Sequence, residues 1–482
     1  MKPNELTLKQ ASEALAAKKL TSVELTTACL NEIEARDAEL GAFLSVDREG
    51  ALKMAKESDA RYAKVESLSP LDGIPLAIKD NILVRGQKAT AGSKMLENYT
   101  ATYDATVIER LKAAGAVLIG KTNCDEFAMG SSGENSAFQK TKNPYDTSRV
   151  PGGSSSGSAV AVSANMAFGS LGSDTGGSIR LPAAFTGVVG LKPTYGRVSR
   201  YGAIAMASSL DQIGPFGKSV WDVAAIMTAI EGYDEKDATS AKEISAVPPE
   251  LLSANMKGKK IGVPKEYFID GMDPLVERCV RESIDAMKEM GAEIVDISLP
   301  HAKYALETYY IVMPAEVSSN LSRYDGIRYG TRLDGGSLEE SYKKTRGELF
   351  GAEPKRRSMI GSYVLSAGYY DAYYDKAQRV RTLLRRDFEE AFKLCDVIVS
   401  PVSPTVAFKV GEKMADPIAM YLSDIYTVSA NMAGIPGLSL PCGFAHGMPV
   451  GLQLMGKWFD EASILNVGLA FESQRDWRVH SY

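Results

Sequence analysis

The chain has 482 residues, of which 45% are hydrophobic and 24% charged, which is usual for a globular protein with a large core. Its formal net charge of −5 excludes a global attraction to nucleic acid or anionic lipid, and the short basic clusters at 257–260 and 355–357 indicate solvated surface. The N-terminus lacks the apolar region of a secretory signal, and no run of about 18 apolar residues is present to span a membrane, so we expect a cytoplasmic protein.

Helical spacing of apolar residues dominates the start of the chain. We predict helix over the first fifty residues, with Thr21 or Ser22 as a cap, and then a short strand within 73–83 that Lys79 interrupts. Residues 104–123 predict a helix, a stop at Gly115 and a buried strand. This alternation predicts an α/β fold with a largely buried sheet.

Serine, glycine and alanine fill residues 150–184, where we predict one small-residue helix near 156–165 and another that begins near Gly177. The polar, proline-containing segment 233–258 predicts a surface connection. A strand–helix–strand unit follows it, and helices then dominate 302–395.

The last hundred residues alternate again between strands and a helix that begins at Asp460. Because strands occur at both ends of the chain around a helical middle, we expect one large sheet with inserted helices rather than two independent domains.

A serine nucleophile in the 150–184 stretch would need a base. The three histidines offer poor candidates, because His301 follows a strand, His446 lies in a turn and His480 is near the C-terminus. Lys79 stands in an apolar segment, where burial would lower its pKa and make it a usable base. The residues alone leave open whether Lys79 is that base, reaches the surface or pairs with Asp80.

Two other chemistries are weighed against a serine mechanism. The five cysteines, at positions 29, 124, 279, 395 and 442, lack CxxC spacing, so we expect reduced thiols and no metal site. Cys124 is the one beside polar groups, but no histidine accompanies it. "GSDTGGS" lacks the lysine of a phosphate loop, and "DTGGS" instead leads into a predicted helix start whose free N–H groups are suited to stabilise an oxyanion.

The stretch "GGSSSGSAVAVSANMAFGSLGSDTGGSIRLPAAFTGVVGLKPT" resembles the amidase signature, and "GIPLAIKDN" carries the lysine of that family. The resemblance implies a Ser–cis-Ser–Lys triad. By position, Ser178 is the acyl nucleophile, Ser154 is the bridging serine after a cis peptide bond, and Lys79 is the base. Ser156 stands where the family usually has glycine, which makes the choice of bridging serine ambiguous, but the spacing to Ser178 favours Ser154.

The same resemblance implies an oxyanion hole lined by the backbone N–H groups of Thr175, Gly176 and Gly177. It also implies an α/β fold with one large mixed β-sheet covered by helices on both faces. We expect a single amidase domain over 1–482, made of the following parts: N-terminal helices at 1–60, a triad core at about 61–230, the connection at about 233–258, and a C-terminal α/β portion with a helical insertion at about 259–482.

Four further stretches resemble the A subunits of glutamyl-tRNA(Gln) amidotransferases, a branch of the family: "KPTYGRVSRYGAIAMASSLDQIGP", "SSNLSRYDGIRYG", "RRSMIGSYVLSAGYYDAYYDKAQRVR" and "MYLSDIYTVSANMAGIPGLSLPCG". The resemblance implies a glutaminase that works in a heterotrimer with subunits B and C and supplies them with ammonia. It implies no cofactor in this chain, ATP and magnesium used by the partner subunit, and tRNA bound mainly through that partner.

For L-glutamine as substrate, the resemblance implies that Arg357 binds the α-carboxylate, that Asp424 binds the α-ammonium, and that Tyr309 adds a hydroxyl contact. The pattern alone favours ordinary helix-surface charge for Arg357 and Asp424. The main alternative is a stand-alone amidase that acts on a small carboxamide. A lipid-amide enzyme lacks a membrane-binding apolar helix here, and the intact Lys79, Ser154 and Ser178 argue against a non-catalytic scaffold.

Overall fold

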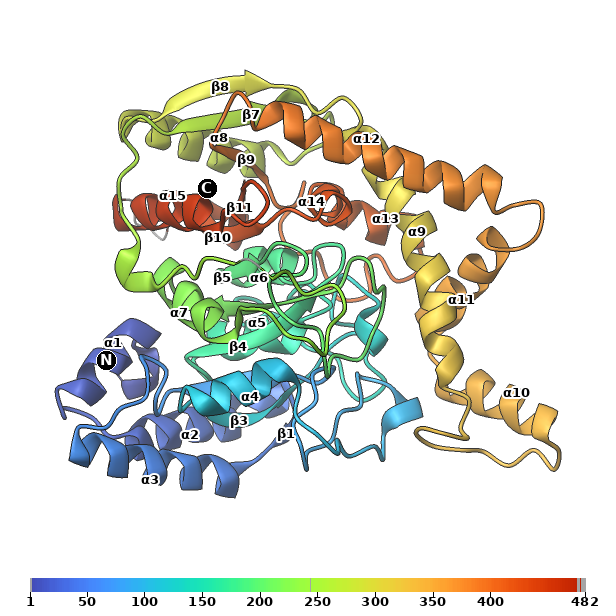
Figure 1. Cartoon of the computed structure of the whole chain (residues 1–482), viewed down its shortest axis with the longest axis horizontal. Coiled ribbons are helices and arrows are strands. Elements are labelled where there is room, and N and C mark those ends of the chain that lie inside the picture. Colours follow the sequence, from blue (N-terminus) through green and yellow to red (C-terminus); the bar gives the residue numbers. More distant parts are fainter. Residues whose placement is uncertain (1, 243, 475–476, 478–482) are drawn as a thin grey trace.

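A mixed sheet of 11 strands runs through the computed structural model, which describes residues 2–242, 244–474 and 477 (Figure 1). The strand order is β1-β3-β2-β4-β6-β5-β10-β11-β9-β7-β8. Strand β2 pairs in parallel with β3 and β4. From β4 through β6, β5, β10 and β11 to β9, each pair of neighbouring strands is antiparallel. The strands are β1 (Phe43–Val46), β2 (Pro75–Lys79), β3 (Val117–Thr122), β4 (Gly169–Asp174), β5 (Val189–Lys192), β6 (Gln212–Gly217), β7 (Lys260–Pro264), β8 (Glu293–Ile297), β9 (Val397–Pro401), β10 (Gly437–Ala445) and β11 (Met448–Met455).

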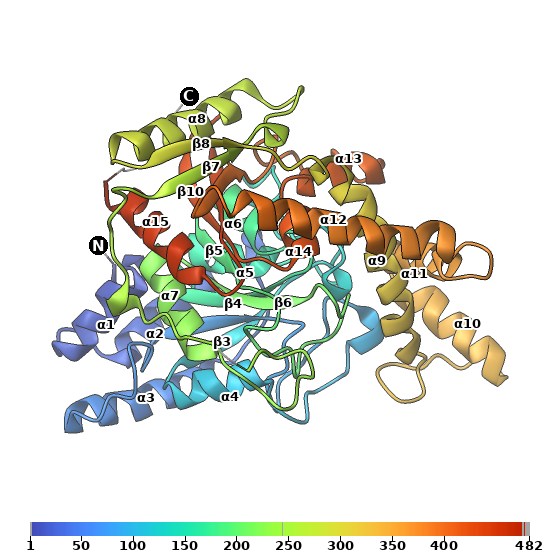
Figure 2. The same cartoon turned by 45° about the horizontal axis from the view of Figure 1, so that its top comes forward.

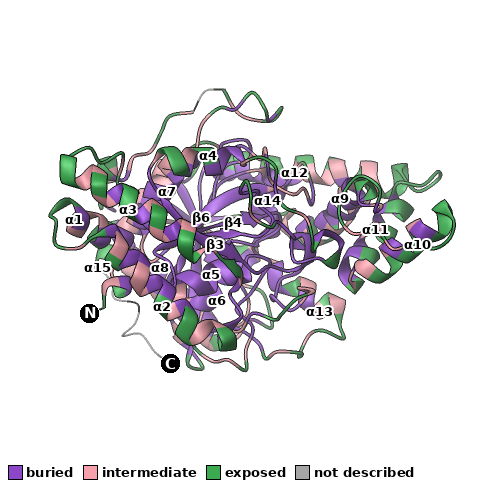
Figure 3. Cartoon of the chain, turned by 90° about the horizontal axis from the view of Figure 1, so that it is seen from below, coloured by how far each residue is buried: buried purple, intermediate pink, exposed green. Residues whose placement is uncertain are grey.

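Helices cover both faces of this sheet, as the resemblance implied. Figure 3 shows α4 and α7 on one side of the buried strands β3, β4 and β6, and α5 and α6 on the other. The helices are α1 (Leu8–Ala16), α2 (Ser22–Leu40), α3 (Arg48–Lys64), α4 (Thr106–Ala113), α5 (Ser156–Ser163), α6 (Arg180–Thr186), α7 (Val220–Ile230), α8 (Pro274–Glu289), α9 (Ala305–Asn320), α10 (Leu338–Leu349), α11 (Ala352–Val364), α12 (Lys376–Ala391), α13 (Pro417–Tyr421), α14 (Val428–Ala433) and α15 (Glu461–Gln474).

The N-terminal region differs from the prediction of continuous helix over the first fifty residues. Helix α2 begins after Thr21, whose hydroxyl accepts the N–H of Glu24 at 3.1 Å, and it ends at Gly41 with φ 63°. The chain then forms strand β1, which pairs antiparallel with β3. A strand of four residues at the edge of the sheet has too short a pattern of alternating side chains to be distinguished, in the sequence, from the helices on either side.

The predicted strand–helix–strand unit is confirmed as β7, α8 and β8, and β7 and β8 pair in parallel. The strand within 73–83 is shorter than expected, because β2 ends at Lys79 instead of continuing past it. The second small-residue helix, α6, begins at Arg180, three residues beyond the predicted start.

The helical middle of the chain packs against one end of the sheet. Helix α12 lies across α9 and α14, and α9 packs against α11 (Figure 2). A second hydrophobic cluster, separate from the main core, fills this junction; it includes Met95, Phe127, Tyr309, Met313 and Met432. Within the described residues, no helix has both the length and the apolar character needed to cross a membrane.

Candidate active site

Lys79 is the last residue of β2 and is fully buried. Its Nζ donates hydrogen bonds to Ser154 Oγ at 2.8 Å, Ser155 Oγ at 2.9 Å and Ser173 Oγ at 2.9 Å. Burial lowers the pKa of Lys79 from 10.5 to about 8, although nearby acidic groups act in the opposite direction. The amine is therefore held among hydroxyl groups in an environment that favours its neutral form.

The alternatives for Lys79 that the sequence left open do not fit these contacts. Lys79 does not reach the surface, and Asp80 forms its ion pair with Lys121, with 3.4 Å between Lys121 Nζ and Asp80 Oδ1. The carboxylate of Asp80 also accepts the backbone N–H of Thr90 at 2.8 Å. Asp80 therefore has partners of its own and does not pair with Lys79.

Of the three adjacent serines, Ser154 and Ser155 contact Lys79, whereas Ser156 does not. The Gly153–Ser154 peptide bond is cis, as the resemblance implied. Ser156 begins α5 and donates to Thr141 Oγ1 at 3.2 Å. The extra serine in the motif therefore does not compete for the position beside Lys79.

Ser178 follows β4 in a turn at the same edge of the sheet, since β4 and β2 are parallel neighbours. Its side chain is nearly buried, and its carbonyl accepts the backbone N–H of Ser155 at 3.3 Å. This bond brings the backbone of Ser178 beside the residue that follows Ser154. The parallel pair thus brings the three expected triad residues to one place.

The turn at residues 175–178 is built from glycines for a steric reason. Gly177 has φ 147°, and a Cβ there would lie 2.3 Å from Thr427 Oγ1; a Cβ at Gly176 would lie 2.7 Å from the Tyr309 hydroxyl. In the described part of the chain, the N–H groups of Gly176, Gly177 and Ser178 donate to no protein acceptor. They are the free amides that an oxyanion requires.

These amides lie just before α6, in line with the predicted helix start, because the Gly177 carbonyl already accepts the N–H of Leu181 at 2.8 Å. Regular helix begins at Arg180, and the carboxylate of Asp174 accepts the N–H of Ile179 at 3.1 Å. Burial alone would raise the pKa of Asp174, but the charge and hydrogen bonds of Arg180 lower it to about 2. The N–H of Ile179, the residue before the helix, is therefore already bound to a charged group.

Two of the expected substrate-binding residues, Asp424 and Tyr309, lie beside this turn. A Cβ at Gly177 would lie 3.3 Å from Asp424 Oδ1, and the Tyr309 hydroxyl lies against Gly176. Asp424 is buried and accepts a hydrogen bond from Ser131 Oγ at 2.5 Å. Burial raises the pKa of Asp424 to about 7, with Ser131 and the charge of Arg357 opposing the shift.

Arg357 lies on α11, and its side chain is only 3% exposed. Its Nε donates to Glu353 Oε1 at 2.7 Å. An open cavity beside it is lined by Gly130, Asn135, Glu353, Arg356, Lys413 and Tyr421, among others. The reading of Arg357 and Asp424 as ordinary surface charges is thus wrong, because both are buried, and the basic cluster at 355–357 is surface only in part.

The alternative nucleophile and bases have other surroundings. Cys124 is buried, and burial raises the pKa of its thiol to about 12. The Nδ1 of His301 lies 2.8 Å from Asp387 Oδ1, and the Nε2 of His446 lies 2.8 Å from Asp273 Oδ2. His480 lies outside the described residues. Across the ranges that the structure describes, no cluster of three or more His, Cys, Asp or Glu side chains is arranged to hold a metal.

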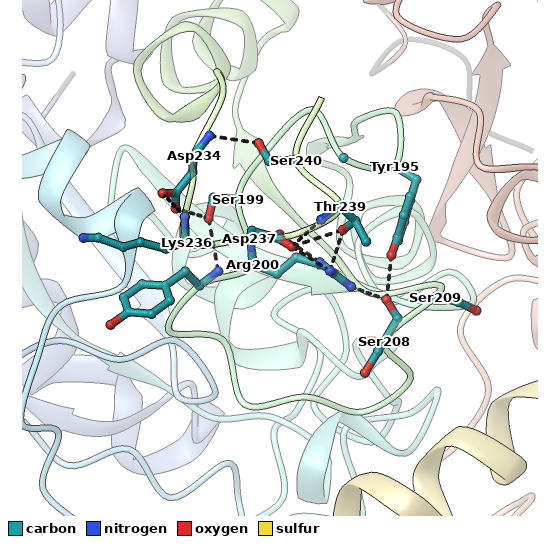
Figure 4. A network of polar contacts seen from close by, with 12 residues as sticks. Tyr195, Ser199, Arg200, Ser208, Ser209, Asp234, Lys236, Asp237, Thr239 and Ser240 are labelled. Atoms are coloured by element: carbon teal, nitrogen blue, oxygen red, sulfur yellow. Dashed lines mark hydrogen bonds and ion pairs between the residues drawn. The ribbon is translucent and has the colours of Figure 1, made fainter. Parts of the chain in front are cut away.

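A network of polar contacts centred on Arg200 ties two loops together near the turn (Figure 4). The Arg200 guanidinium donates to Asp237 through Nε at 3.0 Å and Nη2 at 2.8 Å, and Asp237 also accepts the backbone N–H of Arg200 at 2.9 Å. Nη2 donates to Thr239 Oγ1 at 2.5 Å, and the Tyr195 hydroxyl donates to the Ser208 carbonyl at 2.7 Å. The start of the polar connection is thereby fixed to the segment that precedes β6.

This segment continues to Asp211, which contacts the turn directly. Asp211 accepts the hydroxyl of Thr175 at 2.7 Å and the backbone N–H groups of Met206 at 2.8 Å and Ala207 at 3.1 Å. Asp211 thus holds Thr175 at the start of the turn that carries Ser178.

Several site residues were not predicted from the sequence: Ser131, Ser155, Ser173, Asp211 and Glu353. Ser155 had a local signal, because it is adjacent to Ser154 in the serine run. Ser173 and Ser131 reach the site through contacts with residues far away in the chain, Lys79 and Asp424, so no local spacing marks them.

Comparison with known proteins agrees with this geometry. A family model described as Amidase matches residues 24–465. The A subunit of the glutamyl-tRNA(Gln) amidotransferase of Chloroflexus aggregans is 56% identical over 474 residues, which cover 98% of this chain and 97% of that protein. The corresponding A subunit of Carboxydothermus hydrogenoformans is 54% identical over 473 residues, with 98% of each chain covered.

Solved structures with the same fold include proteins of different function. The crystal structure of the A subunit of glutamyl-tRNA(Gln) amidotransferase from Thermotoga maritima is similar, with a TM-score of 0.81, 41% identity, and coverage of 98% of this chain and 95% of that one. The native peptide amidase from Stenotrophomonas maltophilia also has a TM-score of 0.81, at 33% identity, with coverage of 98% and 97%.

Proposed function

The chain belongs to the amidase family, and on that premise we propose that it is the glutamine-hydrolysing A subunit of a glutamyl-tRNA(Gln) amidotransferase. The observation that carries the proposed chemistry is the fully buried Lys79, whose Nζ lies 2.8 Å from Ser154 Oγ and has its pKa lowered to about 8. A neutral amine in contact with a serine hydroxyl supplies a base without histidine.

In the proposed reaction, Ser178 Oγ attacks the carboxamide carbon of glutamine. Its proton passes to Ser154 Oγ as the proton of Ser154 passes to Lys79 Nζ. The N–H groups of the 175–178 turn stabilise the negative oxygen of the tetrahedral intermediate. The proton then returns through Ser154 to the amide nitrogen, the C–N bond breaks, and ammonia leaves a glutamyl ester on Ser178.

Water completes the cycle by attacking this ester with the same relay as its base. The C–O bond to Ser178 breaks, the proton returns to Ser178 Oγ, and glutamate is released. The free amides of Gly176 and Gly177 serve both tetrahedral intermediates. Apart from glutamine and water, the hydrolysis as proposed uses side chains and backbone groups of this chain.

The buried charges beside the turn support an amino acid as substrate. Arg357 offers a guanidinium to the α-carboxylate, Asp424 offers a carboxylate to the α-ammonium, and the hydroxyl of Tyr309 lies beside Gly176 of the turn. The raised pKa of Asp424, about 7, falls once an ammonium group binds beside it. A simple carboxamide would leave the Nη groups of Arg357 and the carboxylate of Asp424 without the opposite charges that an amino acid supplies.

The names of the relatives support the assembly that we propose. Subunits B and C would join this chain in a heterotrimer, and the ammonia would be used by the partner that activates Glu-tRNA(Gln) with ATP and magnesium. tRNA would contact mainly that partner. A stand-alone amidase is the second candidate, because the peptide amidase shares this fold. Purification separates them, since an amidotransferase component co-isolates with two partners and a stand-alone enzyme does not.

The acyl intermediate can be tested with a diazo-ketone analogue of glutamine. We expect the analogue to add its mass to the peptide that contains Ser178, and we expect Ser178→Ala to abolish the adduct. Cys124→Ala is the matched control and should still be labelled at Ser178, because the raised pKa of Cys124 keeps its thiol protonated. Labelling at Cys124 in the parent protein would contradict the serine mechanism.

A further inference from the structure

Among the described residues, Glu353 is the acidic partner of the Arg357 guanidinium. Its Nε–H is taken by Glu353 Oε1 at 2.7 Å, one helical turn earlier on α11. Nη1 lies 3.6 Å from Met313 Sδ, which is a weak acceptor. The Nη groups thus keep most of their donor capacity, and paired N–H groups of this kind match both oxygens of a carboxylate.

Glu353 is itself held in place by groups outside α11. Its Oε1 also accepts the Tyr421 hydroxyl at 2.8 Å, and its Oε2 pairs with Arg356. Tyr421 stacks on Tyr310 with 3.9 Å between ring centroids, and the Arg357 guanidinium lies over both rings, at 5.5 Å from Tyr310 and 5.7 Å from Tyr421. Glu353 thus contacts both Arg357 and Tyr421, and the rings of Tyr421 and Tyr310 lie beside the Arg357 guanidinium.

The start of α11 is fixed as well. The helix follows Gly351, whose N–H donates to the buried Glu126 Oε2 at 2.8 Å, and Glu353 lies in the first turn. A carboxylate in the first turn is stabilised by the helix dipole. Glu353 thus has a fixed position from which to direct Arg357 one turn later.

A pocket for a zwitterion must keep its own opposite charges apart. Arg357 and Asp424 influence each other electrostatically, yet among the described residues they form no ion pair with each other. Asp424 is restrained by Ser131 at 2.5 Å, and Arg357 by Glu353. Without Glu353, Arg357 would be a buried cation that lacks its ion-pair partner and still acts electrostatically on Asp424, the acid meant for the substrate.

We propose that Glu353 is a positioning residue, which holds Arg357 away from Asp424 and thereby keeps its Nη groups available for the α-carboxylate of the substrate. Glu353 itself contacts no substrate in this arrangement. The inference rests on the proposed function, since it assigns the carboxylate half of glutamine recognition to the pair Glu353–Arg357. It predicts a defect that depends on whether the ligand carries a carboxylate.

The test compares two ligands in the full-length Ser178→Ala protein, which cannot form the acyl intermediate. L-glutamine and 4-aminobutyramide share the carboxamide and the ammonium, but only glutamine carries the carboxylate. We expect Glu353→Gln to raise the Kd for glutamine by about 10- to 100-fold, measured by calorimetry. The Kd for 4-aminobutyramide should stay within about twofold. Glu340→Gln, in the exposed first turn of α10 and paired with Lys343 at 3.1 Å, should change neither Kd.

Tyr421→Phe provides a second variant that keeps all charges and removes one hydrogen bond to Glu353. It should raise the glutamine Kd by a smaller factor and leave the 4-aminobutyramide Kd unchanged, and it decides the matter if Glu353→Gln unfolds. Equal weakening for both ligands, or an unchanged glutamine Kd, would overturn the inference alone. Failure of the parent protein to bind glutamine would overturn it together with the proposed function.

Discussion

Lys79 can act as a base only as a neutral amine, and its surroundings determine how readily the ammonium group loses its proton. Burial lowers its pKa to about 8, and its partners are hydroxyl groups instead of carboxylates. Asp80, the adjacent acid, is paired with Lys121. A direct ion pair with Asp80 would have stabilised the ammonium and removed the base at neutral pH.

We predict that the rate of glutamine hydrolysis rises with pH through about 8 and levels off above it. A lowered lysine pKa means that the neutral amine is present above that pKa, whereas below it the protonated amine cannot accept a proton from Ser154. Initial rates from about pH 6 to about pH 10 test this. A rate that falls as the pH rises through this range would contradict Lys79 as the base.

Replacing Lys79 with alanine should reduce hydrolysis by at least about 10²- to 10⁴-fold, the usual contribution of a general base. The matched control replaces His301, His446 and His480 together and should stay within a few fold of the parent. An inactive histidine variant beside an active Lys79→Ala would show that the base is not Lys79. Steady-state assays of ammonia release distinguish these outcomes.

The sequence offered triad candidates through its motifs, but it did not predict where charges are buried. Lys79, Ser154 and Ser178 stand in long motifs, so their assignment needed no knowledge of the fold. Arg357 and Asp424 are buried with Glu353 and Ser131 as their partners, and the bond from Ser131 to Asp424 joins segments that are distant in the chain. Local charge patterns therefore favoured a surface reading that the tertiary contacts overturn.

At the level of elements, the loop at residues 234–240 is held by side chains and not by regular secondary structure. Burial alone would raise the pKa of Asp237, but the Arg200 guanidinium and two backbone N–H groups hold it well below its usual range. A carboxylate with a lowered pKa stabilises the folded protein above its unfolded pKa, near about 4, and this contribution is lost as the pH falls toward the folded value.

We predict that Asp237→Asn lowers the free energy of unfolding by about 1–3 kcal/mol at neutral pH, since Arg200 loses its ionic partner. The difference from the parent should shrink as the pH falls to about 3, because Asp237 then takes up a proton in the unfolded chain, which favours unfolding of the parent. Denaturant unfolding at both pH values measures this, with the exposed Asp371→Asn as the control that changes neither. A difference that grows at low pH would contradict the assigned role of Asp237.

Elements with a long, regular pattern were predicted well, and short ones were not. The β7–α8–β8 unit and the α4–β3 unit follow from helical and apolar periodicity. Strand β1 has four residues and was read as helix, and α6 starts three residues later than expected. The position of such short elements depends on contacts with residues that are distant in the sequence.

Across the whole molecule, the site draws its parts from both halves of the chain. Strand β5 pairs with β10, so that segments about residues 190 and 438 are neighbours in one sheet. Lys79 and Ser178 come from the first half, and Arg357 and Asp424 from the second. Alternation of helices and strands predicted the fold class, but the strand order depends on pairings between segments too far apart for a local pattern to specify. We propose on these grounds that the chain is a single domain.

The proposed division of labour is tested most directly by changing the nitrogen source in the assembled complex. In the Ser178→Ala complex, formation of Gln-tRNA from glutamine should be lost, because no acyl intermediate forms on this chain. Ammonium salt with ATP should restore the conversion of Glu-tRNA(Gln) to near the parent level, because the partner that performs this conversion takes up ammonia directly. Failure of ammonium to rescue a correctly assembled Ser178→Ala complex would contradict the assignment of this chain as the source of ammonia.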